Sequence, residues 1–116
     1  MAKPISTRVH GVLDYLTAGT LVAAPRMMGW DDKVTRLLTY AGAGVLGYSL
    51  LTRYELGLVK VLPMTGHLAL DAGSGALLIA APFAIVTHEG PAIAAALVTV
   101  GLFEIGASLL TQTKPD

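Results

Sequence analysis

Apolar residues run in four long stretches along this chain, and three short polar segments separate them. The stretches cover about residues 7–28, 34–52, 64–87 and 91–111. A helix needs roughly 20 residues to cross a hydrocarbon core of about 30 Å, and each stretch has about that length. The pattern predicts an all-α fold of four transmembrane helices, in a single integral membrane domain that comprises residues 1–116.

The composition is that of a protein in contact with lipid. Hydrophobic residues make up 53% of the chain and charged residues only 14%, against about 25% charged residues in a typical soluble domain. Eight basic and eight acidic residues cancel, so the chain lacks the positive charge with which proteins bind nucleic acid. It has no cysteine, which excludes thiolate and disulfide chemistry. No phosphate-binding loop or nucleophile motif occurs, and the sequence offers no positive evidence for an enzyme.

Lysine and arginine residues outside the spans predict the orientation in the membrane. Five lie on the side that carries both termini: Lys3, Arg8, Arg53, Lys60 and Lys114. Three lie on the opposite side: Arg26, Lys33 and Arg36. Because cytoplasmic segments carry an excess of positive residues, we expect both termini in the cytoplasm.

The four stretches form an internal repeat of two helical hairpins, at about residues 7–53 and 64–112. A shift of 57 positions superimposes His10 on His67, Asp14 on Asp71, and Pro25 on Pro82. A shift of 59 likewise superimposes residues 47–52 on 106–111 with most identities kept. Two spans per repeat give both hairpins the same membrane orientation, so we expect a pseudo-two-fold axis along the membrane normal.

The segment 19–30, with Pro25 and Trp30, resembles the Ser-Pro-Trp hallmark of the SPW-repeat family, and a second copy surrounds Pro82. Alanine precedes both prolines, where the family has serine. Members of this family are small bacterial membrane proteins built from two-helix repeats. The resemblance implies this repeat architecture and a bacterial inner-membrane location, and it implies no biochemical role and no catalytic residue.

Ionisable residues recur inside the predicted spans. His10 and Asp14 are four residues apart, as are His67 and Asp71, so each pair shares one face of its helix. A charged group costs roughly 2.5–3.5 kcal/mol at the centre of a membrane helix and therefore turns toward protein. Glu104 lies as far from the end of the fourth span as the two aspartates lie from the starts of the first and third spans, so all three carboxylates come to the same depth. We expect these residues in one polar layer with nearby hydroxyl groups, those of Tyr48, Ser49 and Ser108.

Three interpretations of this layer stay open. In the first, the polar side chains only hold the helices together, at roughly 1 kcal/mol per contact. Glu104 fits this least well, because Val45 stands at the equivalent position of the other repeat. In the second, the carboxylates bind a proton or a cation, since carboxylates this close cannot all carry charge without one. In the third, the two His–Asp pairs bind a metal ion such as zinc, or the two histidines bind a haem.

Prolines and small residues predict local features of the helices. Pro25 and Pro82 each remove a backbone donor, so we expect a kink or an early helix end at both. Small residues recur every four positions at Ala72, Ala76 and Ala80, which lets helices approach closely. From the sequence we favour a structural or interaction role in the membrane, with lipid and a second copy or another membrane protein as partners, and we predict no resident cofactor.

Overall fold

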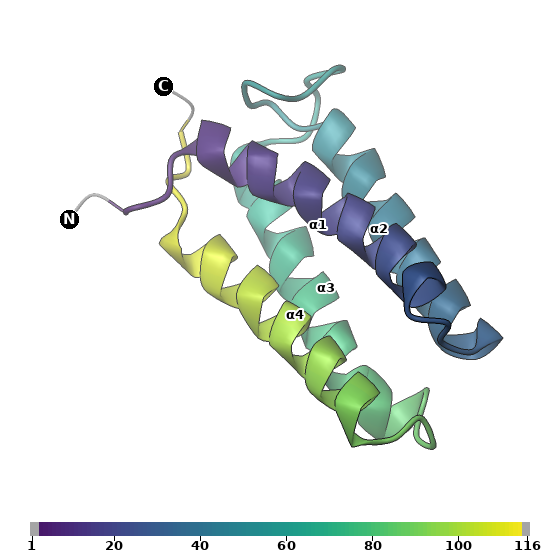
Figure 1. Cartoon of the computed structure of the whole chain (residues 1–116). Coiled ribbons are helices and arrows are strands. Elements are labelled where there is room, and N and C mark those ends of the chain that lie inside the picture. The colour runs from purple at the N-terminus through teal and green to yellow at the C-terminus, as the bar shows by residue number, and fades with distance from the viewer. Residues whose placement is uncertain (1–2, 115–116) are drawn as a thin grey trace.

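The computed structural model describes residues 3–114, which form four α-helices in two hairpins. The helices are α1 (Thr7–Met27), α2 (Asp32–Leu50), α3 (Met64–Ala84) and α4 (Pro91–Leu110). Figure 1 shows that the helices run side by side along one direction. The segment between α2 and α3 lies at one end of the bundle with the first and last described residues, and the two short turns lie at the other. The predicted all-α class and the number of helices are confirmed.

Side-chain caps in the sequence set two of the helix starts. Ser6 Oγ accepts a hydrogen bond from the backbone N–H of Val9 at 3.1 Å, at the start of α1. Asp31 Oδ1 accepts one from the backbone N–H of Val34 at 3.0 Å, at the start of α2. Both bonds satisfy backbone donors that have no partner within the helix, which is the usual role of an N-cap residue.

Prolines lie close to the ends of α1 and α3. Each helix ends two residues after its proline: α1 at Met27 after Pro25, and α3 at Ala84 after Pro82. A proline has no N–H to bond to the preceding turn, so the helix is weakened at that point. The end of α3 therefore falls at Ala84 and not near residue 87, where the length of the apolar stretch would place it.

Helices pack closely within each hairpin and more loosely between the hairpins. Gly75 and Gly101 face each other across α3 and α4, where a Cβ on either would lie 2.5 Å from the carbonyl oxygen of the other. Gly42 on α2 lies in the same way against Ala18 on α1, where a Cβ would lie 2.9 Å from the carbonyl oxygen. These small residues allow the close approach of helices within each hairpin.

The bundle buries a group of polar side chains beside its apolar core, and it also exposes large apolar side chains. The buried polar residues include both intrahelical histidines and three carboxylates. Each helix also carries large apolar side chains that are 63–75% exposed, for example Leu16, Tyr40, Phe83 and Leu109. The apolar core includes Leu21, Leu38, Leu78 and Leu97, so apolar side chains occupy both the interior and the outer faces of the helices.

Two helices, α3 and α4, are long and apolar enough to cross a membrane by length and composition. α1 and α2 have comparable lengths, 21 and 19 residues, but both carry more charge. The charged residues are Arg8, Asp14 and Arg26 in α1, and Asp32, Lys33 and Arg36 in α2. On length and composition, two of the four predicted spans are therefore supported.

Candidate metal centre

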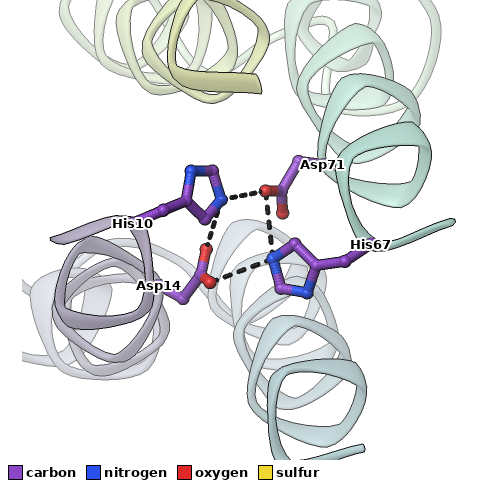
Figure 2. Close-up of side chains that lie close together, drawn as sticks. All are labelled: His10, Asp14, His67 and Asp71. Atoms are coloured by element: carbon purple, nitrogen blue, oxygen red, sulfur yellow. Dashed lines mark hydrogen bonds and ion pairs between the residues drawn. The ribbon is translucent and has the colours of Figure 1, made fainter. Parts of the chain in front are cut away.

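Two histidines and two aspartates from α1 and α3 meet between the hairpins, as Figure 2 shows. His10 Nε2 lies 3.1 Å from Asp14 Oδ1 and 2.6 Å from Asp71 Oδ2. His67 Nε2 lies 2.9 Å from Asp14 Oδ2 and 3.2 Å from Asp71 Oδ2. All four side chains are buried. They form a closed ring in which each imidazole contacts both carboxylates, and we call these four residues the His–Asp quartet.

The helical spacing accounts for half of these contacts. Each histidine meets the aspartate four residues later on its own helix, as the sequence predicts from a shared helix face. The other contacts join α1 to α3, between His10 and Asp71 and between His67 and Asp14. The quartet therefore connects two hairpins that pack loosely elsewhere.

A threonine from the other hairpin holds each imidazole at its outer nitrogen. His10 Nδ1 lies 2.7 Å from Thr111 Oγ1, and His67 Nδ1 lies 2.7 Å from Thr52 Oγ1. Each threonine hydroxyl donates its own proton to the carbonyl oxygen four residues earlier, at 2.6 Å in both cases. The threonine oxygen can then only accept, so Nδ1 carries a proton and Nε2 faces the carboxylates.

Short backbone bridges place the two threonines. Ile5, which precedes α1, pairs with Thr111, and Leu62, which precedes α3, pairs with Thr52. Leu62 follows Ile5 by 57 positions and Thr111 follows Thr52 by 59, so the two pairs occupy equivalent places in the repeat. Neither threonine is among the residues that the sequence predicts for the polar layer, although their equivalence in the repeat is a signal that points to them.

Two tyrosines hold the carboxylates of the quartet. Tyr54 Oη donates a hydrogen bond to Asp14 Oδ2 at 2.7 Å, and Tyr48 Oη donates one to Asp71 Oδ1. Burial, and after it the Asp14 carboxylate, raises the pKa of Tyr54 above its usual range, so the phenol stays a donor. The sequence predicted Tyr48 in this layer, whereas it gave Tyr54 no place there.

Glu104 lies beside the quartet and is not part of it. The residue is 5% exposed and lines a small cavity together with His10, Asp14 and Asp71. Ser74 Oγ lies 3.4 Å from Glu104 Oε1, at the far limit of a hydrogen bond. Glu104 Oε2 is buried and has no hydrogen-bond partner among residues 3–114.

The two predicted serines lie inside the bundle, and the structure gives Ser108 a hydrogen bond within its own helix. Both Ser49 and Ser108 are buried. Ser108 donates its hydroxyl proton to the carbonyl oxygen of Ile105 on its own helix at 2.7 Å. It therefore has no proton left to donate to a carboxylate of the layer.

The donor atoms of the quartet match a metal ion that prefers nitrogen and oxygen ligands. One ligand atom from each of the four residues can be chosen so that all lie within 4.8 Å of one another. Ligands bound to tetrahedral zinc at roughly 2.0 Å lie about 3.3 Å apart, slightly farther than the 2.6–3.2 Å contacts seen here. The four side chains would therefore have to rearrange from a ring of close contacts into a tetrahedron to bind such an ion.

A haem does not fit this arrangement. An iron between two histidines needs a porphyrin plane between the rings, but both Nε2 atoms contact the same two carboxylates. The cavity beside the quartet has a volume of only about 10 Å³. The aspartates thus fill the space that a macrocycle would require.

No family model, curated protein or solved structure matches this chain. Membership of the SPW-repeat family therefore stays a prediction from the residues. The case for a function depends on the geometry of the quartet and its surroundings.

Proposed function

We propose that this protein is an integral membrane protein of four spans whose core binds one divalent transition metal ion, with Zn²⁺ the best fit. The ligands are His10, Asp14, His67 and Asp71. The observation that carries the proposal is the convergence of two imidazole Nε2 atoms on two carboxylates, with both Nδ1 atoms held as donors by threonines.

The surface of the bundle supports four spans. At 1.5 Å per residue, helices of 19–21 residues are about 30 Å long, which equals the hydrocarbon thickness of a bilayer. Exposed charged side chains of residues 3–114 lie in the connecting segments or within two turns of a helix end. Arg26 Nη1, for example, donates to the carbonyl oxygen of Val22 and to Thr39 Oγ1 near the end of α1. The middle of every helix thus presents an apolar surface to lipid.

The hydrogen bonds at Nδ1 of both histidines favour a metal ligand at Nε2. His10 Nε2 is hydrogen-bonded to Asp71 Oδ2, and an imidazole that keeps its proton on Nδ1 and gives up the one on Nε2 offers an electron pair on Nε2 to a metal ion. Histidines that bind metals usually donate the other ring N–H to a neighbouring oxygen, which orients the ring. Thr52 and Thr111 are such acceptors. His67 Nε2 is moreover buried without a well-aligned hydrogen bond, although two carboxylates are near it.

Charge and ligand type favour a divalent transition metal over other cations. Once a metal ion has replaced the protons at Nε2, two carboxylates and two neutral imidazoles bear a charge of −2, and a divalent ion makes the quartet neutral. Calcium and magnesium prefer sites made of oxygen ligands, whereas imidazole nitrogen suits zinc and its neighbours. A set of two nitrogen and two oxygen ligands therefore points to Zn²⁺.

Metal binding can be tested on protein purified in mild detergent and stripped with a chelator. We expect one Zn²⁺ per chain by elemental analysis after reloading and gel filtration. The double substitution His10→Ala and His67→Ala removes both nitrogen ligands and should abolish this stoichiometric binding. His88→Ala is the matched control, because His88 is exposed in the turn between α3 and α4.

The competing role is a metal-free polar link between the hairpins, as the sequence favours. In that case the wild-type protein would hold no stoichiometric Zn²⁺ after reloading. Asp71→Asn keeps the size of the side chain and separates loss of folding from loss of a ligand. A folded Asp71→Asn protein that binds Zn²⁺ as tightly as the wild type would contradict the proposal.

A further inference from the structure

A cavity adjoins the His–Asp quartet on the side of α4. Its volume is about 10 Å³, which is at the lower limit of the cavity volume that admits a single water molecule. Three quartet residues line it, His10, Asp14 and Asp71, together with Glu104. The cavity is thus both polar enough and large enough for one water, which needs two to four polar partners.

Glu104 is the residue on this wall that the quartet does not explain. Its Oε2 is buried and lacks a hydrogen-bond partner within residues 3–114. Its equivalent in the first repeat is Val45, which lines the same cavity from α2. An apolar residue is therefore sufficient for packing at this position of the first repeat. The carboxylate of Glu104 in the second repeat requires a different explanation.

We infer that the metal site keeps a fifth position open toward Glu104, filled by one water that bridges the metal and this carboxylate. The inference rests on the proposed metal binding. The water oxygen binds the metal, and one of its O–H groups donates a hydrogen bond to Glu104 Oε2. Four protein ligands and one water make the ion five-coordinate, a geometry that zinc also adopts.

The fifth position lies on the side of the site that is next to a larger apolar groove. An apolar groove of about 300 Å³ between α1 and α4 shares three lining residues with the small cavity, Leu13, Thr17 and Phe103. These side chains separate the groove from the water position.

Cobalt is a suitable probe, because the visible spectrum of Co²⁺ reports its coordination number. Five-coordinate Co²⁺ absorbs more weakly in the visible range than tetrahedral Co²⁺ does. We expect the five-coordinate spectrum for the wild-type protein in detergent. Glu104→Val copies the residue of the other repeat and removes the acceptor of the water. It should bind Co²⁺ at the same stoichiometry with the stronger tetrahedral bands.

Two further variants separate the role of the carboxylate from a disturbance of α4. Ile105→Val changes the neighbouring residue, which does not line the cavity, and should keep the wild-type spectrum. Glu104→Gln keeps the volume and an acceptor oxygen, and it should also keep the five-coordinate spectrum.

The outcomes separate this inference from the proposed function. If the wild-type protein binds no Co²⁺ and no Zn²⁺, the proposed metal site itself is wrong. If it binds Co²⁺ with a tetrahedral spectrum, the metal site stands and the fifth position is wrong. An identical five-coordinate spectrum in a folded Glu104→Val protein would also overturn the role of Glu104. The wild-type spectrum decides the question even if Glu104→Val fails to fold.

Discussion

At the scale of single residues, two threonines determine how the imidazole rings of the quartet are oriented. Thr52 and Thr111 each use their hydroxyl proton on their own helix and accept from a histidine with the remaining lone pair. An isolated histidine can carry its proton on either nitrogen. Here the threonines fix the proton on the outer nitrogen, so that both inner nitrogens face the carboxylates.

Thr52→Val should weaken Zn²⁺ binding by about 10- to 100-fold, the usual effect of removing a group that orients a metal ligand. Valine has nearly the shape of threonine but cannot accept the hydrogen bond from His67 Nδ1. Thr52→Ser keeps the hydroxyl and should retain most of the affinity. Competition against a coloured chelator measures both dissociation constants. Equal affinities of the valine and serine variants would show that the hydroxyl does not orient His67.

At the scale of helices, glycine contacts set the distance within each hairpin. Gly75 and Gly101 bring α3 and α4 into backbone contact, and Gly42 allows the equivalent approach of α2 to α1. Close backbone contact supplies the van der Waals attraction that drives association of helices in lipid. Some of the small residues therefore serve packing between helices of the same chain. The hairpins that they form present their polar faces to each other.

Gly75→Ala should destabilise the protein by about 1–3 kcal/mol, a usual cost of inserting a methyl group where there is no space. The added Cβ would lie 2.5 Å from the carbonyl oxygen of Gly101, and backbone cannot move aside easily. Gly73→Ala is the matched control on the same helix, because nothing lies within 4 Å of its added Cβ. Unfolding in mixed micelles with increasing dodecyl sulfate measures both variants. A Gly75→Ala protein as stable as Gly73→Ala would contradict the close contact.

At the scale of the whole molecule, the buried quartet joins two hairpins in a bundle whose outer surface is apolar. Within residues 3–114, the contacts between hairpins are few compared with those inside each hairpin. The quartet and its threonines thus form a principal connection between the halves. A metal ion bound there would hold both hairpins at once.

Four spans predict that the two ends of the bundle lie on opposite sides of the membrane. The chain has no cysteine, so single cysteines can report sidedness without background. Lys60→Cys, between α2 and α3, and Glu89→Cys, between α3 and α4, should react with a membrane-impermeant maleimide from opposite sides. Gln112→Cys should react from the same side as Lys60→Cys. If Gln112→Cys and Lys60→Cys react from opposite sides, α3 and α4 do not both cross the membrane, and the proposal of four spans is wrong.

The sequence by itself determined the helices and the polar faces. Long apolar stretches and capping residues such as Ser6 and Asp31 are local signals, and they fix where helices form. The spacing of four residues placed His10 with Asp14 and His67 with Asp71 on shared faces. The cost of burying ionisable groups in lipid indicated that these faces turn inward. Length and composition alone, however, support a membrane span only for α3 and α4.

Only the tertiary structure decided which polar groups meet. The contacts of His10 with Asp71 and Thr111 join residues 61 and 101 positions apart, and no local pattern encodes such a distance. The tertiary structure also gave Tyr54 and Thr52 their roles, and it set Glu104 beside the quartet instead of within it. Helical periodicity defines a direction from one helix axis, whereas a binding site requires the relative rotation and depth of several helices, which their packing alone sets.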